Sequence, residues 1–189
     1  MLKALDAGSD VSSMMLSSFE RLGDEAKRRL DPAINVRRFL DGLRADGLTS
    51  DAVDVLTHLL PKQYAIAWGC ECWEAAHQGR DVDQVDRSAF SAAQRWLKEP
   101  TEEHRKAALE LADRLGYKTS GAWLAAAAGW TGGSMVPGGK VEVPPAAGLP
   151  GVAVAAALKL AAAVDPATFD QKLGEFVDRA LTTFSPSKS

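Results

Sequence analysis

The chain is poor in cysteine and lacks segments that would place it in or across a membrane. Only two of its 189 residues are cysteines, which predicts free thiols in a reducing compartment rather than a disulfide framework. The N-terminus has no apolar core of the kind that secretory signals carry. The longest apolar run, residues 152–164, is interrupted by Lys159 and is shorter than the roughly 20 residues that span a bilayer. We therefore expect a cytoplasmic protein without membrane insertion.

An excess of charge of one sign is also absent. The net charge is −3, and the basic clusters at 27–29 and 37–38 are interleaved with aspartates and glutamates. Such mixed charge is typical of solvated helix faces, so we expect no nucleic-acid partner. The length and the 46% hydrophobic content suit one domain with its own core. We predict a single helical domain over residues 11–184, with flexible ends at 1–10 and 185–189.

Recognisable catalytic and metal motifs are missing as well. There is no Gly-x-Ser-x-Gly elbow for a nucleophile. Cys70, Cys72 and His77 resemble a metal set, but on a helix the two cysteines point about 160° apart, because each residue advances roughly 100°. Glu74 and His77 have the spacing of half a di-iron carboxylate motif, without the second half. We therefore expect no metal, no cofactor and no enzymatic activity.

What the sequence does contain is a strongly apolar helix near its middle, over residues 59–79. Pro61 suits the first turn of a helix, and Gly79 suits its C-terminal end. On a helical wheel, apolar side chains from Tyr64 to Ala76 cover most of the circumference and leave a narrow polar stripe. A helix that is apolar on nearly every side is normally buried. We predict that the other helices pack around this one.

Helical periodicity and capping signals place about eight further helices around it. The predicted starts are Asp31-Pro32, Thr49 or Ser50, Thr101, Thr119 or Ser120, and Asp165-Pro166. The other predicted helices cover 12–30, 81–99 and 151–164. Residues 124–128 are nearly all alanine and should allow tight packing. The fold class is therefore all-α, either a globular orthogonal bundle of about nine helices or, as the alternative, an irregular helical solenoid.

One long segment interrupts this pattern. Residues 131–150 hold five glycines and four prolines, which excludes a helix, although a short β-hairpin around 137–139 is conceivable. A long loop inside a helical domain is often functional. Residues 131–134 (TGGS) suit an anion nest or simply a helix stop. The candidate protein-binding residues are Trp130, Gly132, Gly133, Ser134, Met135, Val136 and Pro137. The alternative is a packed loop that Trp130 holds in place.

Several landmarks in a fixed order resemble a bacterial family of unknown function associated with type VI secretion gene clusters. The resemblance covers about 36–181 and depends on these residues: Leu59-Leu60-Pro61, Ala67-Trp68, Cys70, Trp96, Glu99-Pro100, Glu102-Glu103, Arg105, Ala122-Trp123, 130–134 and Val143-Pro144-Pro145. The family has no established catalytic residues, so the resemblance implies a role beside a secretion machinery and no catalytic activity.

These observations lead to three functional hypotheses. The first is a non-enzymatic accessory, adaptor or chaperone-like protein that binds a secretion component or effector. The second is an immunity-type inhibitor of a secreted effector. The third is an enzyme of unrecognised type, which would require polar side chains such as Glu71, Glu74 and His77 to converge on one pocket. The oligomeric state is left open.

Overall fold

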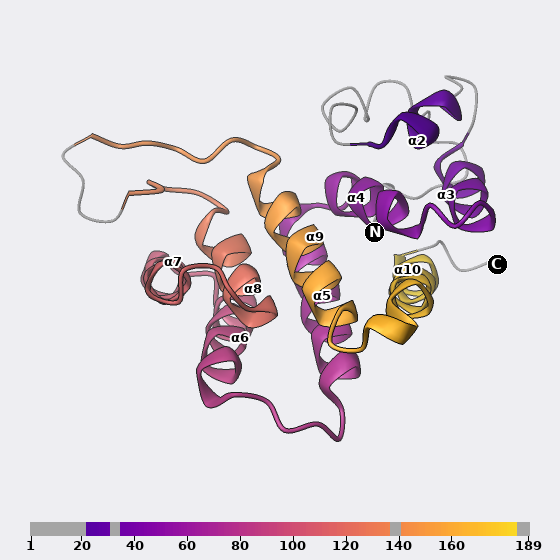
Figure 1. The fold of residues 1–189 in the computed structure, drawn as a ribbon. Coiled ribbons are helices and arrows are strands. Elements are labelled where there is room, and N and C mark those ends of the chain that lie inside the picture. Colours follow the sequence, from indigo (N-terminus) through magenta and orange to yellow (C-terminus); the bar gives the residue numbers. More distant parts are fainter. Residues whose placement is uncertain (1–21, 31–34, 137–140, 185–189) are drawn as a thin grey trace.

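Two helices lie side by side in the middle of the structure, α5 (Lys62–His77) and α9 (Leu149–Ala162) (Figure 1). Three helices pack on one side of this pair, namely α6 (Gln84–Lys98), α7 (Glu102–Arg114) and α8 (Ser120–Gly129). On the other side lie α3 (Val36–Ala45), α4 (Thr49–Leu59) and α10 (Phe169–Phe184), with α2 (Asp24–Arg28) beyond them. A short 3-10 helix, η3 (Pro166–Thr168), precedes α10.

The computed structural model describes residues 22–30, 35–136 and 141–184. Within these ranges there are nine α-helices and no β-strand. The predicted all-α class is confirmed. Helices that are far apart in sequence pack together, for example α4 with α9 and with α10, and α6 with α8. This arrangement is a globular bundle and not a solenoid, because in a solenoid each unit contacts only its neighbours in sequence.

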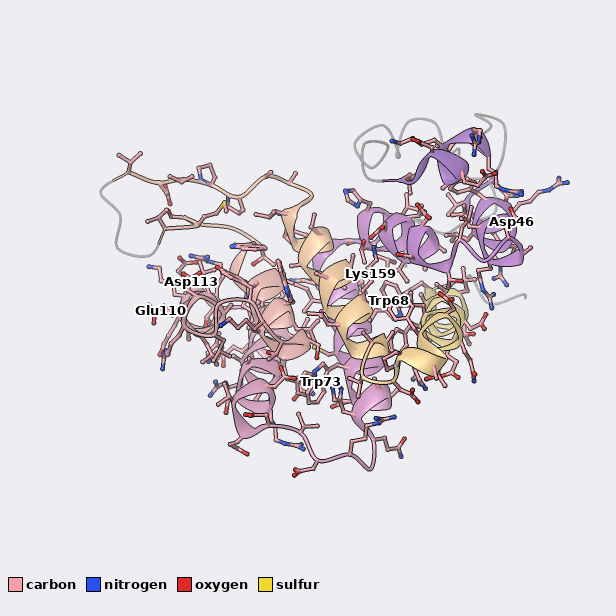
Figure 2. All side chains as sticks on the ribbon, in the orientation of Figure 1. Asp46, Trp68, Trp73, Glu110, Asp113 and Lys159 are labelled. Atoms are coloured by element: carbon pink, nitrogen blue, oxygen red, sulfur yellow. The ribbon has the colours of Figure 1, made fainter. Side chains whose placement is uncertain are left out.

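Helix α5 is enclosed as its sequence predicts. Half of its residues are buried, and these are Ala65, Ile66, Trp68, Gly69, Cys70, Cys72, Trp73 and Ala76. Two indole rings point to opposite sides of the helix in Figure 2. Trp68 Nε1 donates to the Phe176 carbonyl oxygen of α10 at 2.9 Å, and the ring of Trp73 stacks on Phe90 of α6 with centroids 3.9 Å apart. The two tryptophans therefore attach α5 to both flanking groups.

Helix α8 packs most extensively against three helices, α6, α7 and α9, and it also contacts α5. All but one of its ten residues are buried, the exception being Trp123. The predicted tight packing of the alanine run is confirmed. Glycines bring the backbones still closer: a Cβ at Gly129 would lie 2.6 Å from Leu109 Cβ and 2.9 Å from Leu109 Cα of α7. Because glycine has no Cβ, the backbone of α8 contacts its neighbours directly at these positions.

Helix starts were predicted with mixed success. Thr101, Thr119 and Asp165 cap α7, α8 and η3, and each side chain accepts a hydrogen bond from a backbone N–H two or three residues on. Three predicted starts were wrong. Helix α3 begins after Asn35, whose side chain accepts from Arg38 N at 2.8 Å, whereas Asp31 and Pro32 lie outside the described residues. The N-cap of α4 is Leu48, and Thr49 is already helical. Pro61 is the N-cap of α5 and not its first helical residue.

The predicted helix over 12–30 is not continuous within the residues that the structure describes. Gly23 is extended, with φ −60° and ψ 156°, and α2 begins only at Asp24. Gly23 N donates to Asp51 Oδ1 of α4 at 2.7 Å, so a tertiary contact holds the chain in a non-helical conformation there. Residues 12–21 lie outside the described part of the chain.

Tyr64, which belongs to the predicted apolar circumference of α5, lies at the surface, and so does Val85 of α6. Tyr64 is 43% exposed, although its ring meets Phe184 edge-on with centroids 6.0 Å apart, and Val85 is 48% exposed. Each lies in the first turn of its helix, where the neighbouring helices do not reach around the whole circumference. Within the described residues, no single helix is long and apolar enough to cross a membrane. The helices at 149–162 and 166–184 meet that criterion only as a pair, bent by 113°.

The contact between α8 and α6 gives a direct test of backbone packing. A Cβ at Gly121 would clash with the Asp86 carbonyl oxygen and lie 3.1 Å from the Phe90 amide nitrogen. We expect Gly121→Ala to lower the free energy of unfolding by about 1–3 kcal/mol, because backbone atoms cannot move aside. Gly174→Ala in α10 is the control, since nothing lies within 4 Å of its Cβ. It should stabilise by up to about 1 kcal/mol. Urea denaturation measures both, and equal changes would contradict this packing.

Candidate functional site

The segment that joins α8 to α9 extends away from the helices and is called the arm below (Figure 1). Its described residues are 131–136 and 141–148, and they form neither helix nor strand. Three valines of the arm project into solvent: Val136 is 50% exposed, Val141 72% and Val143 44%. Met135, by contrast, packs against the core. The arm therefore has an attached base and an apolar outer part.

The two sides of the arm are held together by a few hydrogen bonds. Met135 N donates to the Val143 carbonyl oxygen at 2.8 Å. The Ser134 hydroxyl oxygen accepts from Val143 N and from Val136 N, each at 3.2 Å. A β-hairpin around 137–139 would show this pairing next to its turn. Among the described residues, however, the two sides of the arm form no β-ladder. Ser134 thus has a local structural role in the arm.

At the base of the arm, Arg105 of α7 lies beneath the glycine pair. Gly133 has φ +61°, and a Cβ there would lie 2.7 Å from Arg105 Cζ. Only glycine adopts this conformation freely and leaves room for the guanidinium group. Nearby, Thr131 Oγ1 donates to the Ala128 carbonyl oxygen at 2.7 Å, and Lys62 Nζ donates to the Thr131 carbonyl oxygen at 3.1 Å. The base is therefore attached to α5, α7 and α8.

Arg105 is 5% exposed, and each of its three guanidinium nitrogens donates a hydrogen bond. Nε and Nη2 donate to the two carboxylate oxygens of Glu102 at 2.6 and 2.7 Å, and Nη1 donates to the Gly129 carbonyl oxygen at the end of α8. The hydrogen bonds to Glu102 raise the pKa of Arg105, and the negative charge of Glu142 in the arm adds to the effect. The same hydrogen bonds lower the pKa of Glu102. The pair stays ionised throughout the physiological pH range.

A cavity of about 490 Å³ opens next to this base, between the starts of α5 and α7 and the end of α8. Its wall includes Pro61, Lys62, Trp96, Thr101, Arg105 and Thr131. These residues are distant in sequence and meet only because α5, α6 and α7 converge with the arm. The volume is within the range of about 300–1,000 Å³ that small-ligand sites occupy.

The predicted site residue Trp130 is buried, with 8% of its surface exposed, and so it adds little to an outer binding surface. Its ring stacks with Tyr117 at a centroid distance of 5.6 Å and meets Trp123 edge-on at 6.1 Å. Tyr117 reaches it from a left-handed conformation with φ 56° just after Gly116. Burial, together with a hydrogen bond to Asp113, raises the pKa of Tyr117. This aromatic cluster fixes the point where the arm leaves α8.

The structure distributes the other predicted site residues over two parts of the arm. Gly132, Gly133, Ser134 and Met135 belong to its partly buried base, whereas Val136 is at the exposed part. Pro137 lies outside the described residues. The exposed Val141 and Val143 were not among the predicted residues. The sequence signal for these two valines was the alternation of apolar residues after the glycines, which we interpreted only as the strands of a hairpin. The protein-binding role of the whole set stays a prediction.

The residues considered for metal or catalytic chemistry do not line this cavity. Glu74 accepts from Gln94 Nε2 at 2.9 Å, and the His77 ring stacks on Trp73 with centroids 4.3 Å apart. In the described part of the chain, no group of three or more His, Cys, Asp or Glu residues is arranged to hold a metal ion. Cys70 and Cys72 are free thiols, and burial raises the pKa of both, that of Cys70 to about 12.

A buried polar cluster that the sequence did not reveal lies between α5, α6 and α8. Trp73 Nε1 donates to Ser120 Oγ at 2.9 Å, and Asp86 Oδ1 accepts from Gly121 N at 2.6 Å. The Asp86 carboxylate thereby satisfies a backbone N–H at the start of α8 that would otherwise lack a partner. Every polar group in the cluster is paired within the protein, which indicates a structural role.

The chain belongs to a family of unknown function, DUF6931, whose model matches residues 39–184. The match includes α4 to α10, the arm and the cavity, and most of α3. No match was found among curated proteins or among solved structures. The family match carries no assigned activity and no secretion setting.

Substitution of Arg105 tests how much this residue stabilises the base of the arm. We expect Arg105→Met to lower the free energy of unfolding by about 1–3 kcal/mol, because the buried Gly129 carbonyl oxygen loses its donor. Lys106→Met is the matched control, since Lys106 is exposed and pairs with the same Glu102 at 3.6 Å. It should change stability by less than about 0.5 kcal/mol. Chemical denaturation followed by tryptophan fluorescence compares the two, and similar losses would exclude a special role for Arg105.

The thiols give a second test. Because Cys70 and Cys72 are buried and have raised pKa values, neither should react with Ellman's reagent at pH 8 in the folded protein. Both should react within minutes in guanidinium chloride. Fast modification of the native protein would mean that α5 is less enclosed than described.

Proposed function

We propose that this protein is a non-enzymatic accessory or adaptor protein that binds another protein through the arm. The proposal rests on one observation: Val136, Val141 and Val143 expose apolar side chains on a segment whose base is firmly attached to the bundle. Of the seven large apolar side chains that are most exposed among the described residues, these three lie on the arm. Grouped exposed apolar residues often mark a protein-binding surface.

The chemistry of the interior supports a binding role over catalysis. A buried thiol whose pKa is near 12 is a poor nucleophile at neutral pH. Glu71, Glu74 and His77, the residues that an enzyme hypothesis would use, do not line the cavity. Asp86 and Arg105 are both occupied by hydrogen bonds within the fold. A binding surface on the arm requires none of these groups to react.

We further propose a bacterial secretion system of the type VI kind as the setting, with a cytoplasmic location, on the resemblance of the sequence landmarks. The bound protein is then either a component of the machinery or an effector. The identity of the partner separates the two roles: a structural component indicates an adaptor, whereas a toxic effector whose growth inhibition is relieved by co-expression indicates an immunity-type inhibitor.

Substitution of the arm valines tests the proposal without deleting the connection between α8 and α9. We expect the triple variant Val136→Ser, Val141→Ser and Val143→Ser to lose at least about tenfold in partner recovery, because each valine contributes on the order of 1 kcal/mol when covered. The measurement is affinity capture of the tagged full chain from cells that express it naturally, with quantitative mass spectrometry.

A double variant, Val85→Ser and Val164→Ser, is the matched control, because these valines are similarly exposed but lie outside the arm. It should recover the partner as the unmodified chain does. Circular dichroism should show all three proteins to be equally folded. If the triple variant and the unmodified chain recover the same proteins in the same amounts, the arm is not the binding surface.

A further inference from the structure

The cavity beside the arm contains a lysine that forms no ion pair with a carboxylate in the described part of the chain. Lys62 lies in the first turn of α5 with an exposed side chain. Its ammonium group donates to the Thr131 carbonyl oxygen at 3.1 Å, and no carboxylate lies within ion-pair distance among the described residues. An ammonium group has three donors, so two remain for a ligand.

The second cation of the cavity is already neutralised. Arg105 is held by the bidentate contact with Glu102, the one acidic residue among the described residues that line the cavity. The Arg105–Glu102 pair therefore shapes the cavity without adding net charge to it. Glu142 of the arm adds a negative charge that acts on Arg105. Among the described residues of the wall, Lys62 is the positive group without an ion-pair partner. Helix α5 adds to this, because its first backbone N–H groups also face this end and its N-cap, Pro61, provides no side-chain acceptor.

The rest of the wall combines polar residues, Gln63, Thr101 and Thr131, with an apolar part. Pro61 and Pro100 are exposed at the edge of the cavity, and the indole of Trp96 forms part of its wall. An inorganic anion would use the ammonium group of Lys62 and the first N–H groups of α5, but it would leave the apolar part of the wall uncovered. A ligand with an acidic group next to an apolar one would use both parts of the wall.

We infer that this cavity binds a carboxylate group carried beside an apolar side chain, with Lys62 as the residue that contacts the carboxylate. The inference rests on the proposed function in one respect: the natural source of this carboxylate is the protein bound by the arm. Because Lys62 also contacts the Thr131 carbonyl oxygen, the cavity lies at the base of the same arm that carries the exposed valines.

Small acids of matched shape test the cavity on the full-length protein. The probes are hexanoate and hexanamide, which share an apolar chain and differ in charge, together with acetate and inorganic phosphate. In ¹H–¹⁵N NMR titrations, we expect hexanoate to shift the backbone signals of Lys62, Gln63, Thr101 and Gly132. Hexanamide and acetate should bind at least about tenfold more weakly, because each lacks one of the two contacts. Phosphate should not compete with hexanoate.

Three substitutions locate the charge. Lys62→Gln should weaken hexanoate binding by about tenfold or more, since a charge-assisted hydrogen bond is lost. Lys62→Arg should restore most of the affinity. Lys172→Gln, on α10 and away from the cavity wall, should leave it unchanged. Equal binding of hexanoate and hexanamide, or full hexanoate binding by Lys62→Gln, would overturn the inference. So would signal shifts confined to other regions, or displacement of hexanoate by phosphate.

Two peptides distinguish the sources of the carboxylate. Acetyl-Leu-Leu presents a free C-terminus, and acetyl-Leu-Glu-Leu-amide presents an acidic side chain. At least one peptide should displace hexanoate, and the peptide that binds more tightly identifies the source of the carboxylate. If neither peptide displaces hexanoate, the site binds only free acids, and its link to a protein partner is overturned. The triple valine variant should still bind hexanoate, so the cavity can be confirmed even if the arm fails its own test.

Discussion

The structure depends on direct backbone contact around α8. This helix can lie against α6, α7 and α9 together, and also contact α5, because seven of its ten residues are alanine or glycine. Dispersion forces decline steeply with distance, so close approach compensates for small side chains through many short contacts. The same device recurs at Gly69, where a Cβ would lie 2.7 Å from Leu124 Cδ2, and at Gly151, where it would lie 2.5 Å from the Thr57 carbonyl oxygen. Small residues thus join α4, α5, α8 and α9.

Close packing alone does not fix how the helices are positioned relative to one another. Buried and partly buried polar contacts fix these positions. Trp68 is hydrogen-bonded to the backbone of α10, and Trp73 reaches Ser120 at the start of α8. On the other side, Lys159 of α9 forms an ion pair with Asp54 of α4 at 2.8 Å, and Lys159 can be followed from α9 in Figure 2. Each contact has fixed geometry, and a shifted helix would leave a buried polar group without its partner.

Local signals explain what could be predicted from the sequence. Thr101, Thr119 and Asp165 were identified as caps because a capping side chain and the N–H that it accepts lie within three residues. The enclosure of α5 followed from its apolar circumference. The interruption at Gly23 could not be foreseen, because the contact that holds it comes from Asp51 in another helix.

The candidate site also has some features that the sequence predicts and others that only the tertiary fold creates. Its glycines, and the loop to which they belong, stand out in the sequence. The cavity does not, since Lys62, Arg105 and Thr131 come from three separate segments that only the tertiary fold brings together. The burial of Trp130 depends on Tyr117 and Trp123, and the left-handed turn that positions Tyr117 has no strong sequence signal beyond Gly116.

The arm begins at the end of one buried helix and ends at the start of another, and these two helices pack tightly against each other. Its two attachment points are therefore held at a constant separation by the core. Insertions or deletions between them would alter how far the arm reaches and which residues it presents, while the bundle itself would stay the same. The domain thus separates the bundle and the base of the arm, which the fold fixes, from the outer part of the arm, which the core does not constrain, as antibody frameworks do for their hypervariable loops.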